Sequence, residues 1–328
     1  FAHVLVLTPW KGPRHRFFRP WGEDGCSSGL YPGFTGFMIS PLSKLGLGSA
    51  QFGLDSTTLI RGRSPVSEAR EILDIAARSR LPVFDVDGHS AVAEAALGEI
   101  LPRPNPFRVS ISTVRPDRGP DYVEAEARAT LRRLGVEQAD AILVPAAADL
   151  FGPHGLALWD RLKALKDQGL TRKIGVSVFA SDDPLGVARR FRPDIVQAPA
   201  SLLDQRLLID GTHAALAGLG IEVHLRSIFL NGLLFLPPDR APHHLKAAAS
   251  RISRARRLIA EGRSDPLQAA LGFALSRVEA ATVLVGVTSP AELSAVIAAA
   301  SSPPPDLDWD EMAIDDPVAL DPRAWAAA

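Results

Sequence analysis

Apolar segments that favour β-strands alternate with amphipathic helical segments from residue 38 to residue 300, and this alternation limits the folds open to the chain. It yields eight strand–helix units of about 36 residues each, a usual size for a βα unit. The expected strands are 43–48, 82–85, 107–113, 139–144, 173–178, 195–197, 221–226 and 282–285. The expected helices are 67–79, 91–100, 122–134, 156–168, 184–190, 206–219, 241–261 with 266–277, and 290–299.

The composition of the strands indicates how they are covered. Segments 141–144 and 282–285 are apolar without alternation, which is typical of parallel strands with helices on both faces. Eight such units predict an α/β fold, a (β/α)8 TIM barrel with its chemistry at the carboxyl ends of the strands. A doubly wound open sheet is the alternative, but no Gly-x-Gly-x-x-Gly turn follows the first strand.

The two ends of the chain differ from this repeating region. Residues 1–37 are rich in Gly, Pro and Arg and have no helical or alternating period. We expect an irregular N-terminal extension or leader, with three readings open: a non-native or processed leader, a functional arm, or a cleaved targeting segment. Residues 38–328 would form the barrel domain, with a C-terminal tail from about residue 301. The prolines at 303–305 cannot continue the preceding helix.

Charge and cysteine content exclude several classes of protein. The chain has 36 basic and 37 acidic residues, which argues against a dedicated nucleic-acid binder. Its one cysteine, Cys26, rules out an intrachain disulfide and a cysteine zinc site. No apolar run reaches the roughly 18 residues of a membrane span. We therefore expect a cytoplasmic monomer without nucleic-acid or membrane partners, and no metal site.

Short motifs at the strand ends resemble the aldo-keto reductase superfamily along residues 38–300. Each is weak alone, but their order and spacing are specific. The motifs are KLGLGSAQFG at 44–53, FD at 84–85, EAALG at 94–98, LRRLGV at 131–136, IGVS at 174–177, DIVQ at 194–197, RSIFLNGLL at 226–234 and VGVTS at 285–289.

This resemblance implies a barrel enzyme that uses NADPH, less often NADH, to reduce aldehydes and ketones. The family uses a tetrad of Asp, Tyr, Lys and His. The Tyr donates a proton to the carbonyl oxygen, the Lys and Asp lower its pKa, and the His orients the substrate.

Three of the four tetrad positions differ from the family pattern. Asp85 stands at the Asp position, but the Tyr, Lys and His positions hold Ser90, Val114 and Pro145. No shift of the alignment restores them, because Tyr122 lies on a later helix and no lysine occurs between Lys44 and Lys163. We therefore predict weak or absent standard carbonyl reduction, as in a pseudoenzyme.

The positions matching the family's cofactor site are mixed. Ser177 and Gln197 match the residues that bind the nicotinamide carboxamide, and Ala295 and Val296 replace the Glu-Asn pair that clasps adenosine. We expect weak binding of NADP or NAD with little preference between them. Each polar position also has a structural reading, as a cap or a buried hydrogen-bonding group. The candidate cofactor residues are Gly48, Ser49, Ser177, Gln197, Ser227, Gly286 and Ser289.

The segment 85–90 gathers two carboxylates, an imidazole and a hydroxyl at one strand end. It is a polar loop in the simplest reading. Alternatively, Asp85 or His89 supplies a replacement acid, and the protein is a working oxidoreductase on a small carbonyl or sugar. A third reading is a sugar-modifying enzyme without redox chemistry, with Asp85, Asp87 and His89 as acid/base groups. The sequence names no substrate for any of these readings.

Overall fold

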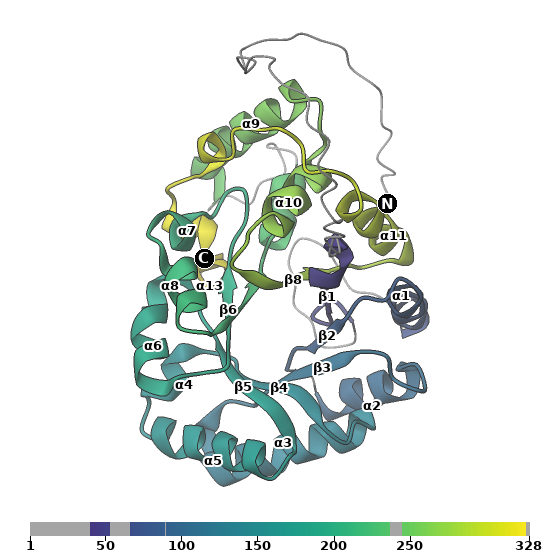
Figure 1. The fold of residues 1–328 in the computed structure, drawn as a ribbon, viewed down its shortest axis with the longest axis vertical. Helices are drawn as coiled ribbons and strands as arrows, with labels where there is room; N and C mark the ends of the chain where they lie inside the picture. Colours follow the sequence, from purple (N-terminus) through teal and green to yellow (C-terminus); the bar gives the residue numbers. More distant parts are fainter. Residues whose placement is uncertain (1–39, 53–65, 89, 237–244, 326–328) are drawn as a thin grey trace, which may run out of the picture.

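Eight parallel strands close into a barrel in chain order, with helices around the outside, in a computed structural model that describes residues 40–52, 66–88, 90–236 and 245–325 (Figure 1). β1 pairs with β8 to close the ring. The strands are β1 Leu45–Gly48, β2 Val83–Val86, β3 Arg108–Ser112, β4 Ala139–Val144, β5 Thr171–Ser177, β6 Ile195–Pro199, β7 Glu222–Arg226 and β8 Ala280–Gly286. The longer helices are α1 Val66–Arg78, α2 Ala91–Ile100, α3 Pro120–Leu134, α5 Gly155–Asp167, α6 Pro184–Phe191, α8 Thr212–Gly218, α9 Lys246–Glu261, α10 Pro266–Leu275 and α11 Pro290–Ala300. The predicted (β/α)8 TIM barrel is confirmed.

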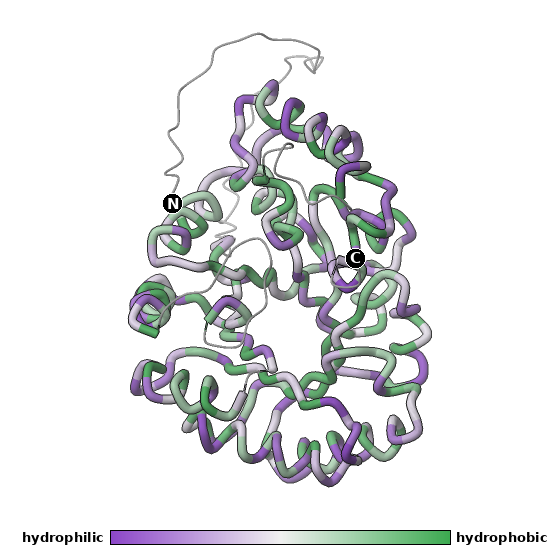
Figure 2. Tube along the Cα trace, turned by 180° about the vertical axis from the view of Figure 1, so that it is seen from behind, coloured by the Kyte–Doolittle hydropathy of each residue, from purple (hydrophilic) through white to green (hydrophobic). Residues whose placement is uncertain are grey.

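The apolar residues of the strands form two separate layers. A large cluster fills the space between the strands and the helices, and it includes most of the buried leucine and valine side chains. A small cluster of Ala141, Leu143 and Ile195 lies apart from it. Because successive residues of a strand point to opposite faces, these three side chains occupy the barrel interior. The strands are strongly hydrophobic, and the outer surfaces of the helices carry the hydrophilic residues (Figure 2).

The helices follow local signals in the sequence. α3 begins with Pro120 at its first turn, where the missing N–H costs nothing, and ends at Gly135 with a φ of 64°. Its buried side chains include Val123, Ala127 and Leu131, which share one face through i, i+4 spacing. α2 packs closely on α3, since a Cβ on Gly98 would lie 2.0 Å from the Arg133 carbonyl oxygen.

Two predicted elements need correction. The single helix expected over 206–219 is wrong, because the chain forms a short helix α7 at Arg206–Ile209 and then α8, separated by Gly211 with a φ of 77°. The strand expected over 43–48 begins later, because Pro41–Lys44 forms a 3-10 turn. The first residues of the helix expected over 241–261 lie outside the described residues.

The C-terminal tail packs against the barrel through the loops that follow β5 and β6. α11 ends at Ala300, just before the proline run. Ile314 N donates to the Leu203 carbonyl at 3.0 Å, and Gln205 Nε2 donates to the Trp309 carbonyl at 2.6 Å. The short helices α12 Pro317–Leu320 and α13 Pro322–Trp325 complete the tail, and the Trp325 side chain is buried. The tail thus lies near the ends of β5 to β7.

Candidate active site

A pocket of about 320 Å³ lies at the carboxyl ends of the strands, where a barrel of this type carries its chemistry. Strand alternation explains its composition, because side chains two residues apart point to the same face. Asp85 and Asp87 both line this face at the end of β2. Ser177 at the end of β5 and Arg226 at the end of β7 line the same pocket. Nine of the residues singled out in the sequence line the pocket: Gly48, Ser49, Asp85, Asp87, Pro145, Ser177, Gln197, Ser227 and Gly286.

Four other predicted site residues have different positions. Ser90 is the N-cap of α2, and its Oγ accepts a hydrogen bond from Ala93 N at 3.3 Å. Val114 packs partly buried against the large apolar cluster. Ser289 is the N-cap of α11, with its Oγ accepting from Glu292 N at 3.2 Å. His89 lies outside the described residues.

Asp85 is the buried acid of the pocket. Its Oδ1 accepts a hydrogen bond from Gln197 Nε2 at 3.1 Å. Burial raises the pKa of Asp85 to about 7, and the negative charge of Asp87 adds to the rise. The Gln197 hydrogen bond and the positive charge of Arg226 oppose it. A substantial fraction of Asp85 is therefore protonated at neutral pH.

Arg226 is a cation held by neutral groups at the end of β7. Its Nε donates to Ser177 Oγ at 3.0 Å, one Nη to Ser227 Oγ at 3.1 Å and the other to the Val178 carbonyl at 2.6 Å. Its guanidinium lies over the Phe179 ring, 4.1 Å from the ring centroid. Burial lowers the pKa of Arg226 to about 10, which leaves it charged at physiological pH.

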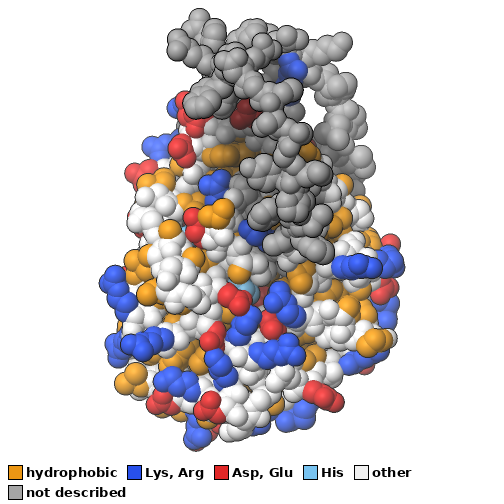
Figure 3. All heavy atoms as spheres, viewed as in Figure 1, with side chains coloured by type: hydrophobic (Ala, Val, Ile, Leu, Met, Phe, Trp, Pro, Cys, Tyr) orange, Lys and Arg blue, Asp and Glu red, His pale blue; other side chains and the backbone are white. Residues whose placement is uncertain are grey.

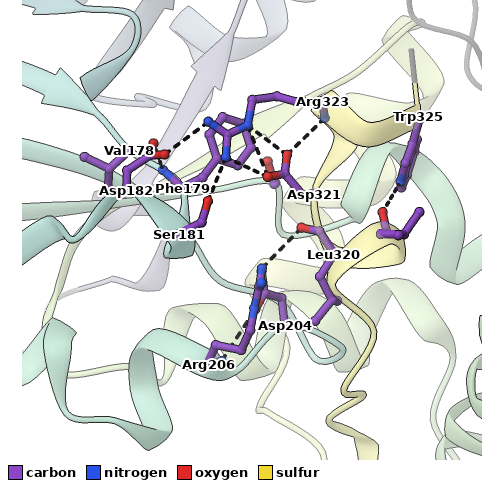
Figure 4. Close-up of polar contacts among 12 residues, drawn as sticks. Val178, Phe179, Ser181, Asp182, Asp204, Arg206, Leu320, Asp321, Arg323 and Trp325 are labelled. Atoms are coloured by element: carbon purple, nitrogen blue, oxygen red, sulfur yellow. Dashed lines mark hydrogen bonds and ion pairs between the residues drawn. The ribbon is translucent and has the colours of Figure 1, made fainter. Parts of the chain in front are cut away.

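The tail reaches the same aromatic ring from α13. The guanidinium of Arg323 lies 3.8 Å from the Phe179 centroid. The guanidinium groups of Arg323 and Arg226 thus both lie over the Phe179 ring. Arg323 also donates to Asp182 and Ser181 and pairs with Asp321, as Figure 4 shows. The tail thereby fixes one wall of the pocket.

Several pocket residues had no assigned role in the sequence reading. Arg226 is the first residue of the motif at 226–234, and Gln51 lies within the motif at 44–53. Neither motif assigns a role to them. Phe179 and Asn231 follow strand ends, and both line the pocket. Their place after a predicted strand was the one available signal, since strand ends meet at this edge of the barrel.

The closed parallel barrel, with polar side chains around a pocket at its carboxyl edge, defines the class as a (β/α)8-barrel protein of the enzyme type. The aldo/keto reductase family model matches residues 44–314, most of the chain. The chain therefore belongs to the aldo/keto reductase family. A search of the curated proteins found no match.

Solved structures agree on the fold. The holo form of the aldo-keto reductase AKR11C1 from Bacillus halodurans superposes with a TM-score of 0.67 at 20% identity, over 82% of this chain and 89% of that one. Its apo form gives a TM-score of 0.61 at 19% identity, over 82% and 89% of the two chains. At these identities the likeness concerns the barrel architecture alone.

The family generally uses NAD(P)H, and one end of the pocket fits the nicotinamide part of such a cofactor. Gln51 Oε1 is buried without a hydrogen-bond partner and lies beside Gly286, where a Cβ would approach it to 2.1 Å. The amide of a flat nicotinamide ring can donate a hydrogen bond to such an acceptor, and a glycine has no side chain to keep the ring away from the backbone. Ser177 and Gln197 lie on the same pocket, with their polar atoms engaged by Arg226 and Asp85.

The region expected to hold adenosine fits less well. Thr288 N donates to the Glu292 carboxylate at 2.8 Å, so the loop carries an acidic group beside Ser289. Ala295 is exposed, and Val296 is buried in the apolar cluster. The alanine side chain has no group that could hydrogen-bond an adenine.

The described surface offers no sign of a metal or a membrane span. Among the described residues, no group of three or more His, Cys, Asp and Glu side chains is placed to hold a metal ion. In the same part of the chain, no helix is both long and apolar enough to cross a membrane. Basic and acidic side chains are interspersed over the face seen in Figure 3.

Proposed function

We propose that this protein binds NAD(P)H weakly in the barrel pocket and reduces ordinary aldehydes only slowly. The observation that carries the proposal is the state of Asp85. In the family pattern a lysine lies near this carboxylate, whereas here the carboxyl group has Gln197 as its hydrogen-bond partner and a pKa of about 7. Among the described residues that line this pocket there is no tyrosine, and therefore no phenol whose pKa a neighbouring cation could lower.

Bound NAD(P)H would supply a hydride at this pocket. The chain's own residues would do the remaining work: Gln51 accepts a hydrogen bond from the ring amide, and Asp85 holds a proton at the base of the pocket. Ser90, the residue at the tyrosine position, caps α2. Its hydroxyl is a far weaker acid than a phenol, whose pKa is about 10. Slow proton delivery follows from this substitution.

Direct titration tests the cofactor part of the proposal. We expect NADPH and NADH to quench tryptophan fluorescence with similar dissociation constants, in the micromolar range or weaker. The acidic Glu292 and the apolar Ala295 provide the physical reason, since neither binds a 2′-phosphate. Submicromolar binding of NADPH with strong discrimination against NADH would contradict it.

A second candidate is a working reductase in which Asp85 itself donates the proton. The favourable observation is its pKa of about 7 inside a pocket, which suits a general acid at neutral pH. This candidate differs from the first in its pH dependence. Reduction would be brisk below pH 7 and would fall as Asp85 loses its proton above it.

A further inference from the structure

Arg226 is a half-buried cation at the end of β7. Its printed partners are the hydroxyls of Ser177 and Ser227 and the carbonyl of Val178. Within the described ranges no carboxylate forms an ion pair with it. A guanidinium withdrawn from water is costly unless an opposite charge accompanies it.

The guanidinium still has hydrogen-bonding capacity. It carries five N–H groups, and three of them are engaged. One N–H therefore remains on each terminal nitrogen. Two donors on neighbouring nitrogens match the two oxygens of a carboxylate. The Arg226 guanidinium lies over the Phe179 ring, and the tail residue Arg323 contacts the same ring.

The other charged groups near Arg226 do not neutralise its positive charge. Asp87, Asp182 and Asp321 act on Arg226 only at a distance, and Arg323 opposes them. Asp87 is exposed at the rim, and its Oδ1 accepts from Gly88 N at 2.9 Å. Asp182 and Asp321 are paired with Arg323. Water screens the exposed Asp87, so a ligand anion would meet Arg226 as the dominant charge.

The rest of the pocket indicates what else the ligand carries. Asn231 and Ser112 line the same cavity, in addition to the acceptor that Gln51 offers to the cofactor ring. Their amide and hydroxyl groups can hydrogen-bond hydroxyls of a ligand.

We infer that Arg226 selects a small ligand that carries both a carboxylate and hydroxyl groups, as a sugar acid does. This inference deepens the proposed function by naming the class of its substrate. The same anion chemistry could come from a cofactor phosphate. The substrate carboxylate is favoured because Arg226 contacts Ser177 and influences Asp85, at the base of the pocket.

Calorimetry with D-glucuronate and D-glucuronamide tests the inference, since the two probes differ only in that a neutral amide replaces the carboxylate. The full chain should bind glucuronate at least tenfold more tightly than the amide, with or without saturating NADPH. Arg226→Met should reduce this preference to about twofold or less, and Arg226→Lys should leave an intermediate preference, because lysine keeps the charge without the fork. The matched control Arg277→Met, whose guanidinium lies over the Phe273 ring in the segment before β8, at the opposite end of the barrel, should retain the preference.

Three results would overturn the inference: equal affinity for both probes, no binding of either probe, or a preference that survives Arg226→Met. A fourth would assign Arg226 to the cofactor instead, namely loss of NADPH affinity in Arg226→Met together with competition by inorganic phosphate. Near-ultraviolet circular dichroism verifies the fold of each variant. Because glucuronate binding is also measured without NADPH, where no turnover can occur, weak cofactor binding or slow reduction leaves the result interpretable.

Discussion

Aldehyde reduction should rise about 10²–10⁴-fold when Ser90→Tyr, Val114→Lys and Pro145→His are combined. The three changes return the residue types of the family tetrad at the matching positions. Pro145 lines the pocket, and the longer Tyr and Lys side chains would have to reach it from the cap of α2 and from the edge of the apolar cluster, where Ser90 and Val114 lie. Asp85 is already in place, and a lysine near it would lower its pKa from about 7. NADPH oxidation with a simple aldehyde, compared between the parent and the triple variant, measures the gain.

The single changes serve as controls. Ser90→Tyr alone should add little activity, because its phenol lacks a cation to lower its pKa. It also removes the N-cap of α2, at a cost of about 1 kcal/mol in the free energy of unfolding. Pro145 follows β4 directly, so Pro145→His needs its own check by circular dichroism. A folded, NADPH-binding triple variant that is no faster than the parent would show that another group limits the reaction.

Replacing Asp85 with asparagine should stabilise the protein at pH 8 by up to ~4 kcal/mol and leave its stability at pH 4 nearly unchanged. The pKa of Asp85 rises from 3.8 to about 7 on folding, so the folded state holds a proton that the unfolded chain releases. The parent therefore loses stability as the pH rises from about 4 to about 7. Asparagine removes this loss and still offers an oxygen to Gln197 Nε2.

Urea unfolding of the parent and Asp85→Asn at pH 4, 6 and 8 measures this difference. The matched control is Asp117→Asn, at an exposed aspartate in the turn before α3, which should follow the parent at every pH. An Asp85→Asn variant that is less stable than the parent at pH 8 would mean that Asp85 is ionised in the folded protein. The pocket would then contain an ionised Asp85 carboxylate paired with a cation, in place of a neutral acid.

The periodicity of the sequence was sufficient to predict the barrel, because apolar strands without alternation require helices on both faces. The strand ends follow from the same periodicity, and the family resemblance indicates Asp85, Ser177 and Gln197 at three of them. All three line one pocket. The break at Gly211 was harder to predict. A glycine inside a helical pattern is tolerated in many helices, and only its positive φ shows that the helix ends there.

The candidate site was only partly predictable. The direction of a side chain determines whether it serves the pocket or the local helix. The hydroxyls of Ser90 and Ser289 cap helices and do not line the pocket. Arg226 could not be assigned from its motif, because its importance rests on which partners surround it. The Arg323 contact with Phe179 joins residues 144 positions apart, and no local pattern reports such a contact.

We propose that the pocket binds the cofactor and has no proton donor whose pKa is lowered by a neighbouring cation. Rapid mixing of NADPH-saturated protein with an excess of aldehyde, followed by nicotinamide absorbance, tests it most directly because it observes the hydride transfer itself. We expect the parent to transfer hydride at least about 10²-fold more slowly than the triple variant at both pH 6 and pH 8. A fast burst in the parent at pH 6, lost at pH 8 and abolished by Asp85→Asn, would contradict the claim and make Asp85 the proton donor.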